Sequence, residues 1–130
     1  MLIPGFNEQE LSPHLVKSDI FMACIQQTEK DLHAYGIQIP LQLPGTMPLR
    51  ELLHELTPQL HRLLEHGTHL QEILYRVDVS ESILQKALAA CQDMPLEELL
   101  GRLIILRELQ KVLTRQSFSS NNASNDWDDV

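Results

Sequence analysis

The stretch from Pro95 to Arg115, PLEELLGRLIILRELQKVLTR, decides the fold that this sequence predicts. Positions three and four apart share one face of a helix, and here nearly every face carries leucine, isoleucine or valine. An ordinary surface helix is apolar along one stripe, whereas a helix that is apolar nearly all round is buried on several sides. Pro95 marks the start, where a missing N–H is tolerated. We therefore predict a central helix over residues 95–115, covered by the rest of the chain.

Two apolar lines run along this central helix. The first comprises Leu96, Leu99, Leu103, Leu106 and Leu113, and it is widened by Leu100 and Ile104. The second comprises Ile105, Leu109 and Val112. Either the chain's own helices enclose both lines, or the second line is the interface of a homodimer. The pattern is the same in both cases, so Ile105, Leu109 and Val112 are the predicted interface residues of a self-associating protein.

Length, composition and charge place the chain in a broad class. Its 130 residues fit one domain, and 43% apolar with only 5% aromatic residues indicates a leucine core and an all-α fold. A formal net charge of −8 argues against nucleic acid and anionic membranes as partners. No run approaches the ~18 apolar residues of a membrane span, and the N-terminus lacks the pattern of a signal peptide. These features predict a cytoplasmic protein.

Further helices are predicted on both sides of a proline-containing segment. One helix runs from Ser12-Pro13 to Gly36, and a second opens at Thr46 to Pro48 and ends at Gly67. Residues 37–48, IQIPLQLPGTMP, alternate apolar and polar positions, but their prolines exclude an interior strand. The fold class is therefore an all-α bundle of four to five helices, with an extended proline-containing connector between the first two.

Local signals refine this picture. Pro58 predicts a kink or break in the second long helix. Thr68 with Gln71 forms a possible capping box for a short helix, and Asp78 or Ser80 caps the next one.

The two ends of the chain differ from the bundle between them. The N-terminal arm is expected to pack Leu2, Ile3 and Phe6 onto the domain, and Asn7 with Glu10 offers a helix start. Residues 117–130, SFSSNNASNDWDDV, are polar and acidic without periodicity, which predicts a disordered tail after a single domain of residues 1–116. The tail contains the one tryptophan, between Asp126 and Asp128, and this is either a short docking motif or a frayed end.

Histidine and glutamate gather on the second long helix, where a metal site would need them. The candidate ligands are Glu51, His54, His61 and Glu65. Glu51 and His54 have the Glu-x-x-His spacing of di-iron bundles, but such sites use two copies of that motif. His54 and His61 also lie opposite the leucine stripe, so they should face solvent. We therefore predict no native metal site and no cofactor, with a metal-binding bundle as an alternative.

Residues 71–88, QEILYRVDVSESILQKAL, resemble a helix-turn-helix in outline. Leu74 stands where that motif prefers a small residue, and Asp78 stands where its turn usually has glycine. The second helix offers one basic residue, Lys86, which is too little for contacts with phosphate and bases. A DNA-binding regulator is therefore an alternative, and no nucleic-acid partner is predicted.

No phosphate loop, Cys-x-x-Cys motif or nucleophile in a known context occurs in the sequence. Cys24 and Cys91 fall on apolar helical faces and are expected to be buried free thiols. The sequence thus predicts a non-enzymatic protein-protein interaction module, whose partner is a second copy of itself or another protein.

Overall fold

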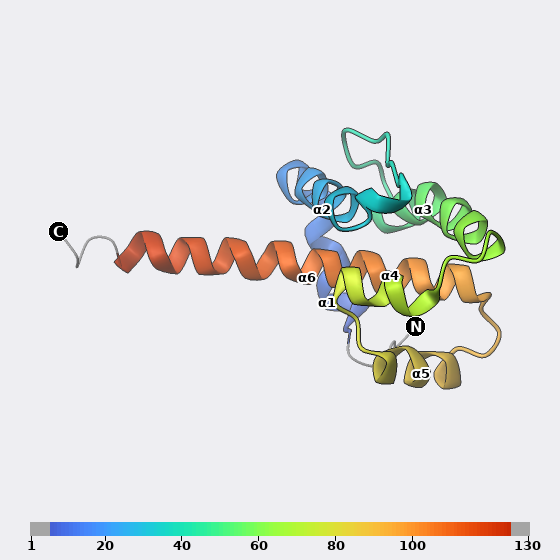
Figure 1. Ribbon diagram of the computed structural model, residues 1–130. Coiled ribbons are helices and arrows are strands. Elements are labelled where there is room, and N and C mark those ends of the chain that lie inside the picture. The colour runs from blue at the N-terminus through green and yellow to red at the C-terminus, as the bar shows by residue number, and fades with distance from the viewer. Residues whose placement is uncertain (1–5, 126–130) are drawn as a thin grey trace.

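A computed structural model shows that the described part of the chain is all-helical, as predicted (Figure 1). The structure describes residues 6–125, and the side chains of residues 6–117. Within that range it has six α-helices, more than the four or five predicted, and two short 3₁₀ helices. In chain order these are α1 Glu8–Leu11, η1 Ser12–Val16, α2 Ser18–Asp31, η2 His33–Tyr35, α3 Pro48–Glu65, α4 Leu70–Val77, α5 Glu81–Ala90 and α6 Leu96–Asn125.

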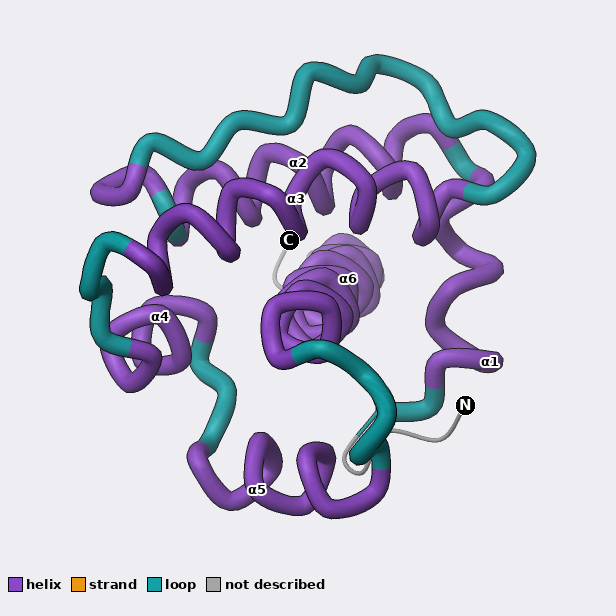
Figure 2. The backbone as a smooth tube through the Cα atoms, turned by 90° about the vertical axis from the view of Figure 1, so that its right-hand side faces the viewer, coloured by secondary structure: helices purple, strands orange, loops and turns teal. Residues whose placement is uncertain are grey.

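Helix α6 is the axis of the fold. Viewed along α6, the other helices form a ring around it, and α1 to α5 all contact it (Figure 2). This explains why α6 is apolar on nearly every side, since each side meets a different neighbour. The fully or almost fully buried apolar residues of α6 are Leu99, Leu100, Leu103, Ile104, Ile105, Leu106, Leu109 and Val112.

The predicted dimer interface is corrected by this arrangement. The exposed fractions of Ile105, Leu109 and Val112 are 0%, 0% and 2%, because the chain's own helices cover them. They therefore offer no surface to a second copy in this fold. Of the two interpretations of the second apolar line, enclosure within a single chain is the one that the structure shows.

Close packing of α3 on α6 depends on one glycine. A Cβ atom on Gly101 would lie 3.2 Å from Cδ2 of Leu53 and 3.2 Å from Oγ1 of Thr57. Both distances are shorter than ordinary van der Waals contact. Glycine at this position thus lets the two longest helices approach each other closely.

Helix α3 is continuous from Pro48 to Glu65, so of the kink or break predicted at Pro58 the structure excludes the break. Pro58 is exposed, and the helix loses one hydrogen bond, to the carbonyl of His54, on a side that water can reach. The leucine face opposite keeps its packing, with Leu52, Leu56 and Leu60 fully buried. Burial on the far side thus outweighs one missing hydrogen bond.

Residues 37–47 connect η2 to α3 with neither helix nor strand. Ile37 and Ile39 are buried, whereas Leu43 is 70% exposed. Side chains hold the first part of the connector: the N–H of Ile39 donates to Glu29 Oε2 (2.9 Å), and Gln59 binds the backbone of residue 38. The connector is therefore fastened near its start, and its apolar side chains are not all inside.

The helix caps follow the sequence signals in part. Asn7 caps α1 and Ser80 caps α5, as predicted, but α4 starts after His69 without a side-chain cap, so the capping box at Thr68 is wrong. Phe6 is buried, whereas residues 2 and 3 lie outside the described range.

The end of α6 also differs from the prediction. Its backbone is helical to Asn125, whereas the composition of residues 117–130 predicts a disordered tail. The remaining residues of the predicted tail, 126–130, lie outside the described range. Figure 1 shows that this last part of α6 leaves the bundle. Within residues 6–125 no helix combines the length and the apolar character needed to cross a bilayer.

Candidate functional site

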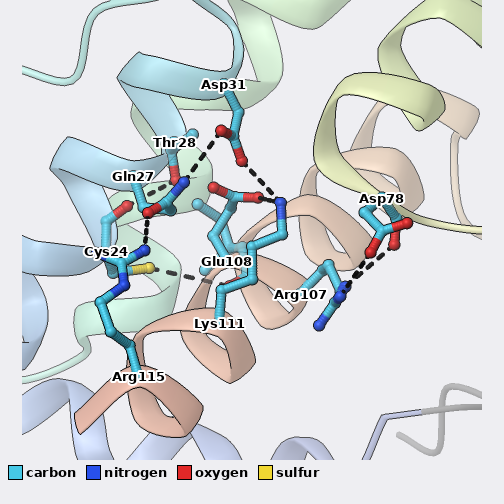
Figure 3. A network of polar contacts seen from close by, with 10 residues as sticks. Cys24, Gln27, Thr28, Asp31, Asp78, Arg107, Glu108, Lys111 and Arg115 are labelled. Atoms are coloured by element: carbon cyan, nitrogen blue, oxygen red, sulfur yellow. Dashed lines mark hydrogen bonds and ion pairs between the residues drawn. The ribbon is translucent and has the colours of Figure 1, made fainter. Parts of the chain in front are cut away.

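A cluster of ionic and polar side chains lies between α2 and α6, inside an otherwise apolar core (Figure 3). Lys111 Nζ is 2.7 Å from Asp31 Oδ2 and 2.9 Å from Glu108 Oε1, so one ammonium group serves two carboxyl groups. Gln27 donates to Asp31 Oδ1 (3.0 Å) and accepts from Arg115. The two helices are thus joined by a connected polar network as well as by apolar contacts.

Glu108 is the most unusual member of this ionic cluster. Its side chain has no exposed surface, and Oε2 accepts no hydrogen bond from the described residues. Burial raises the pKa of Glu108 to about 8, and the neighbouring Asp31 adds to the increase, although Lys111 opposes it. Glu108 is therefore mostly protonated at neutral pH.

Asp31 and Lys111 keep their charges. Burial alone would raise the pKa of Asp31, but hydrogen bonds from Lys111, Glu108 and Gln27 hold it below its ordinary value. Burial likewise works against the charge on Lys111, yet its bonds to the two carboxyl groups raise its pKa. The cluster thus contains one carboxylate, one ammonium group and one neutral acid, which avoids an unpaired charge in the core.

The geometry limits what this ionic cluster can do chemically. A carboxyl group with a pKa near neutrality is typical of general acids, but such a group must reach its substrate. Glu108 is enclosed, and the side chains of Asp31 and Lys111 are only 15% and 18% exposed. Cys24 is also enclosed, and burial with the nearby Glu108 raises the pKa of its thiol to about 12, which makes it a poor nucleophile. The cluster can couple the stability of the fold to pH.

A hollow of about 880 Å³ opens beside this cluster, between the end of α2, the α4–α5 turn and the middle of α6. We call it the α4–α5 hollow. Three of its side chains are cationic, namely Lys30, Arg76 and Arg107. Its apolar lining consists of Phe6, Leu74, Val79 and Ile83. Tyr75, which is 87% exposed, stands at its edge.

The acids of the α4–α5 hollow already have partners. Asp31 binds Lys111, and Asp78 Oδ2 lies 2.8 Å from Arg107 Nη2, whose charge and hydrogen bond lower the pKa of Asp78 (Figure 3). Lys30 and Arg76 form no ion pair with the side chains of residues 6–117. The α4–α5 hollow is thus a locally basic place on an acidic protein.

A second surface depression follows the first turns of α3. Two adjoining hollows of about 690 and 450 Å³ share Thr46, Met47, Arg50 and His54, and we call them together the α3 groove. Its walls come from η1, the connector and the start of α6. Val16 and Met47 line it although they are 62% and 51% exposed. The apolar side chains of the α3 groove are Leu41, Val16, Met47, Leu49 and Leu53.

The candidate metal ligands are divided between the two ends of α3. The carboxylate of Glu51 accepts hydrogen bonds from the N–H groups of Gly45 (2.9 Å) and Met47 (3.2 Å), and so fastens the connector to the helix. His61 lies ten residues further along α3, about 15 Å at 1.5 Å per residue. Its Nε2 is 3.0 Å from Glu65, and its Nδ1 is 3.4 Å from Glu97.

His54, the fourth candidate, lines the α3 groove and is exposed. Among the described side chains no group of three or more histidine, cysteine or acidic residues could hold a metal ion. The structure thus does not bring the four candidate ligands together.

The segment that resembles a helix-turn-helix forms α4, a tight turn and α5. Asp78 takes the left-handed conformation in that turn (φ 62°), a position that glycine often occupies and that aspartate tolerates. Leu74, which stands where that motif prefers a small residue, is buried in the core. Lys86 is the one basic residue of α5 and is exposed. The turn geometry therefore serves the packing of the ring around α6.

The sequence contains a signal for the buried acid, Glu108. The spacing of apolar residues alone does not reveal it. Glu108 has Ile104 and Ile105 one turn before it and Val112 one turn after it, so it lies within an apolar face. A carboxyl group in that position needs a buried hydrogen-bonding or ionic partner, and Lys111, one turn further along α6, is one such partner. No pattern within a single segment could reveal Asp31, which lies 80 residues before Lys111 in the sequence.

Comparison of the chain with protein-family models, with curated proteins and with solved structures gave no match. The function of the protein is therefore inferred from its surfaces and its ionic cluster.

Proposed function

We propose that the protein is a non-enzymatic protein-protein interaction module, and that its α3 groove binds an amphipathic helix of a partner protein. The observation that carries this proposal is the pair of exposed apolar side chains, Val16 and Met47, that face the same groove. Exposed apolar residues gathered in a depression mark binding sites more often than isolated ones do. Burying one such side chain contributes about 1–2 kcal/mol to binding.

A helix fits the α3 groove better than an extended peptide does. An extended peptide gains affinity by pairing with free backbone groups of its receptor. Along the connector, the N–H groups of Gln38, Ile39, Gly45 and Met47 already bind side chains. A helix satisfies its own backbone and needs only apolar contact, for which the unbranched, flexible Met47 is suited.

The charge around the α3 groove specifies the partner further. Four glutamates and two arginines line it, namely Glu8, Glu51, Glu55, Glu98, Arg50 and Arg102. Glu8 and Glu98 both pair with Arg102, and the four glutamates outnumber the two arginines, so the lining of the α3 groove has a formal net charge of −2. A partner helix with an apolar face and basic flanks is therefore complementary, and complementary charge raises association rates and specificity.

A peptide-binding experiment tests this function. The probe is a synthetic amphipathic helix of leucine and lysine, and its acidic counterpart contains glutamate in place of lysine. We expect the basic peptide to bind the native protein at least ~10-fold more tightly than the acidic peptide, and Met47→Glu to weaken it by ~10-fold or more. Leu43→Glu, at an exposed apolar residue outside the α3 groove, is the matched control and should bind like the native protein.

Equal effects of Met47→Glu and Leu43→Glu would show that the peptide senses only net charge, and the proposal would then be wrong. It would also be wrong if the native protein bound the basic and the acidic peptide equally well.

Two further parts of the proposal concern location and assembly. Cys24 and Cys91 are both buried free thiols, which suits the reducing conditions of the cytoplasm, and we propose that location. Self-association is also retained as a proposal, although α6 cannot supply its interface through the three buried residues named above. Another surface is needed for contacts between copies.

A further inference from the structure

The α4–α5 hollow has a chemical character that differs from the rest of the protein. The chain has a formal net charge of −8, yet this hollow contains the side chains of Lys30, Arg76 and Arg107. Of these, Lys30 and Arg76 lack ion-pair partners among the described side chains, as shown above. The guanidinium of Arg76 is held 5.7 Å from the centre of the Tyr35 ring, so it is positioned as well as charged.

The same hollow also offers apolar and aromatic contacts. Leu74, Val79 and Ile83 form its apolar side, and the ring of Tyr75 is 87% exposed. A ligand that combines an aromatic ring with several negative charges would therefore satisfy both parts of the lining. Aromatic residues and arginine dominate the energetics of protein interfaces in general.

This chain contains a segment with that composition. Residues 126–129 have the sequence Asp-Trp-Asp-Asp, with the protein's one tryptophan placed among three aspartates. They follow directly on α6, and they lie outside the described residues. The charges of this segment and of the α4–α5 hollow are complementary, whereas the apolar segment of residues 1–5, MLIPG, would leave Lys30 and Arg76 without partners.

Distance decides whether the segment can reach the hollow of its own chain. The hollow lies beside Arg107 and Gln110 of α6, and fifteen residues of helix separate Gln110 from Asn125, about 22 Å. Four residues in the most extended conformation span at most about 14 Å. While α6 remains helical to Asn125, residues 126–129 cannot return to the hollow of the same chain.

We propose that residues 126–129 of one copy bind the α4–α5 hollow of a second copy. Reciprocal binding pairs the two α6 helices antiparallel along the parts that leave the bundle, and this arrangement is closed and two-fold symmetric. The proposal supplies the contact surface that self-association lacks. It does not depend on the α3 groove, so the two proposals can fail separately.

Trp127 gives a direct signal for this contact, because no other tryptophan contributes to the fluorescence. In a dilution series of the full chain, we expect blue-shifted emission from the dimer and red-shifted emission from the monomer, with a parallel fall in mass by sedimentation. Lys30→Glu combined with Arg76→Glu should raise the dimer dissociation constant by ~10-fold or more. Lys17→Glu with Lys86→Glu changes the net charge equally at exposed sites outside the hollow, and should leave the constant within ~3-fold.

A charge exchange adds a test that misfolding cannot imitate. Replacing the three aspartates of residues 126–129 by lysine should abolish dimers, and mixing this variant with the Lys30→Glu, Arg76→Glu variant should restore heterodimers. Emission that is blue-shifted at every dilution would mean binding within one chain, and emission that is red-shifted throughout would mean no binding. Either result overturns the proposal, as does a dimer that the hollow variant leaves unchanged.

Discussion

Glu108 makes the stability of this protein depend on pH in a direction that can be derived from the structure. The folded protein keeps a proton on Glu108 up to about pH 8, whereas the unfolded chain releases it near pH 4.5. Between these values the unfolded state binds fewer protons, so the free energy of unfolding falls as pH rises. From pH 5.5 to pH 7.5 this single group lowers the free energy of unfolding by about 2 kcal/mol.

Its neighbours do not change charge in that interval. The pKa of Asp31 is held below its ordinary value of 3.8, so it is ionised in both states. The pKa of Lys111 is raised above 10.5, so it is protonated in both. The contribution of Glu108 is therefore fully present below about pH 4.5 and is lost as the pH rises through 8.

Urea unfolding followed by circular dichroism at pH 5.5 and pH 7.5 measures the effect, with Glu108→Gln as the test variant. Glutamine has the shape of the neutral acid and cannot titrate, so the variant should lose about 2 kcal/mol less stability than the native protein over this interval. Glu81→Gln makes the same substitution at an exposed residue of α5 that forms no ion pair with the described side chains, and it should retain the native dependence on pH. Taking the difference between native and variant removes the contributions of all other groups.

One result would refute the reasoning about the ionic cluster. If the native protein and Glu108→Gln lose stability in parallel as the pH rises, Glu108 is already ionised in the folded state. The conclusion that the folded protein keeps Glu108 protonated at neutral pH would then be wrong.

Three further substitutions test the fold. Gly101→Val introduces side-chain atoms where a Cβ would already lie 3.2 Å from α3, and should destabilise the protein by about 2 kcal/mol or more, measured by urea unfolding. Gly36 has φ 71° with open space around it, so Gly36→Ala should cost about 1 kcal/mol through backbone strain, and Gly36→Asn less; equal losses would contradict this explanation. Ser80→Ala removes the cap that accepts from Ile83 N–H, and should lower the melting temperature in line with a loss of about 1 kcal/mol, whereas Ser82→Ala should not.

The central helix could be predicted because its signal is local. Apolar residues at every angle around residues 96–112 require burial on all sides, and the structure shows that burial. The pattern could not show whether the apolar faces of α6 are buried by the same chain or by a second copy, because the sequence is the same in both cases. The assignment of Ile105, Leu109 and Val112 to a dimer interface was wrong for this reason.

The functional proposals rest on the α3 groove and the α4–α5 hollow. Neither surface has a local sequence pattern from which it could be predicted. Val16 and Met47 face one groove only because η1 packs beside the start of α3, and the sequence between them has no feature that reports this approach. The α4–α5 hollow likewise combines residues from four helices. Composition alone does not locate the end of α6, because polar residues can continue a helix that is already nucleated, and extension needs far less stabilisation than initiation.

The position of α6 at the end of the chain order has a consequence during synthesis. Asp31 leaves the ribosome 80 residues before Lys111, an interval of roughly 4 to 16 s at ordinary rates of translation. During that time the apolar faces of α2 and α3 have been synthesised, but the helix that covers them has not. The nascent chain therefore cannot complete its core until α6 has been synthesised. We expect chaperones that bind exposed apolar segments to bind the chain before α6 emerges from the ribosome.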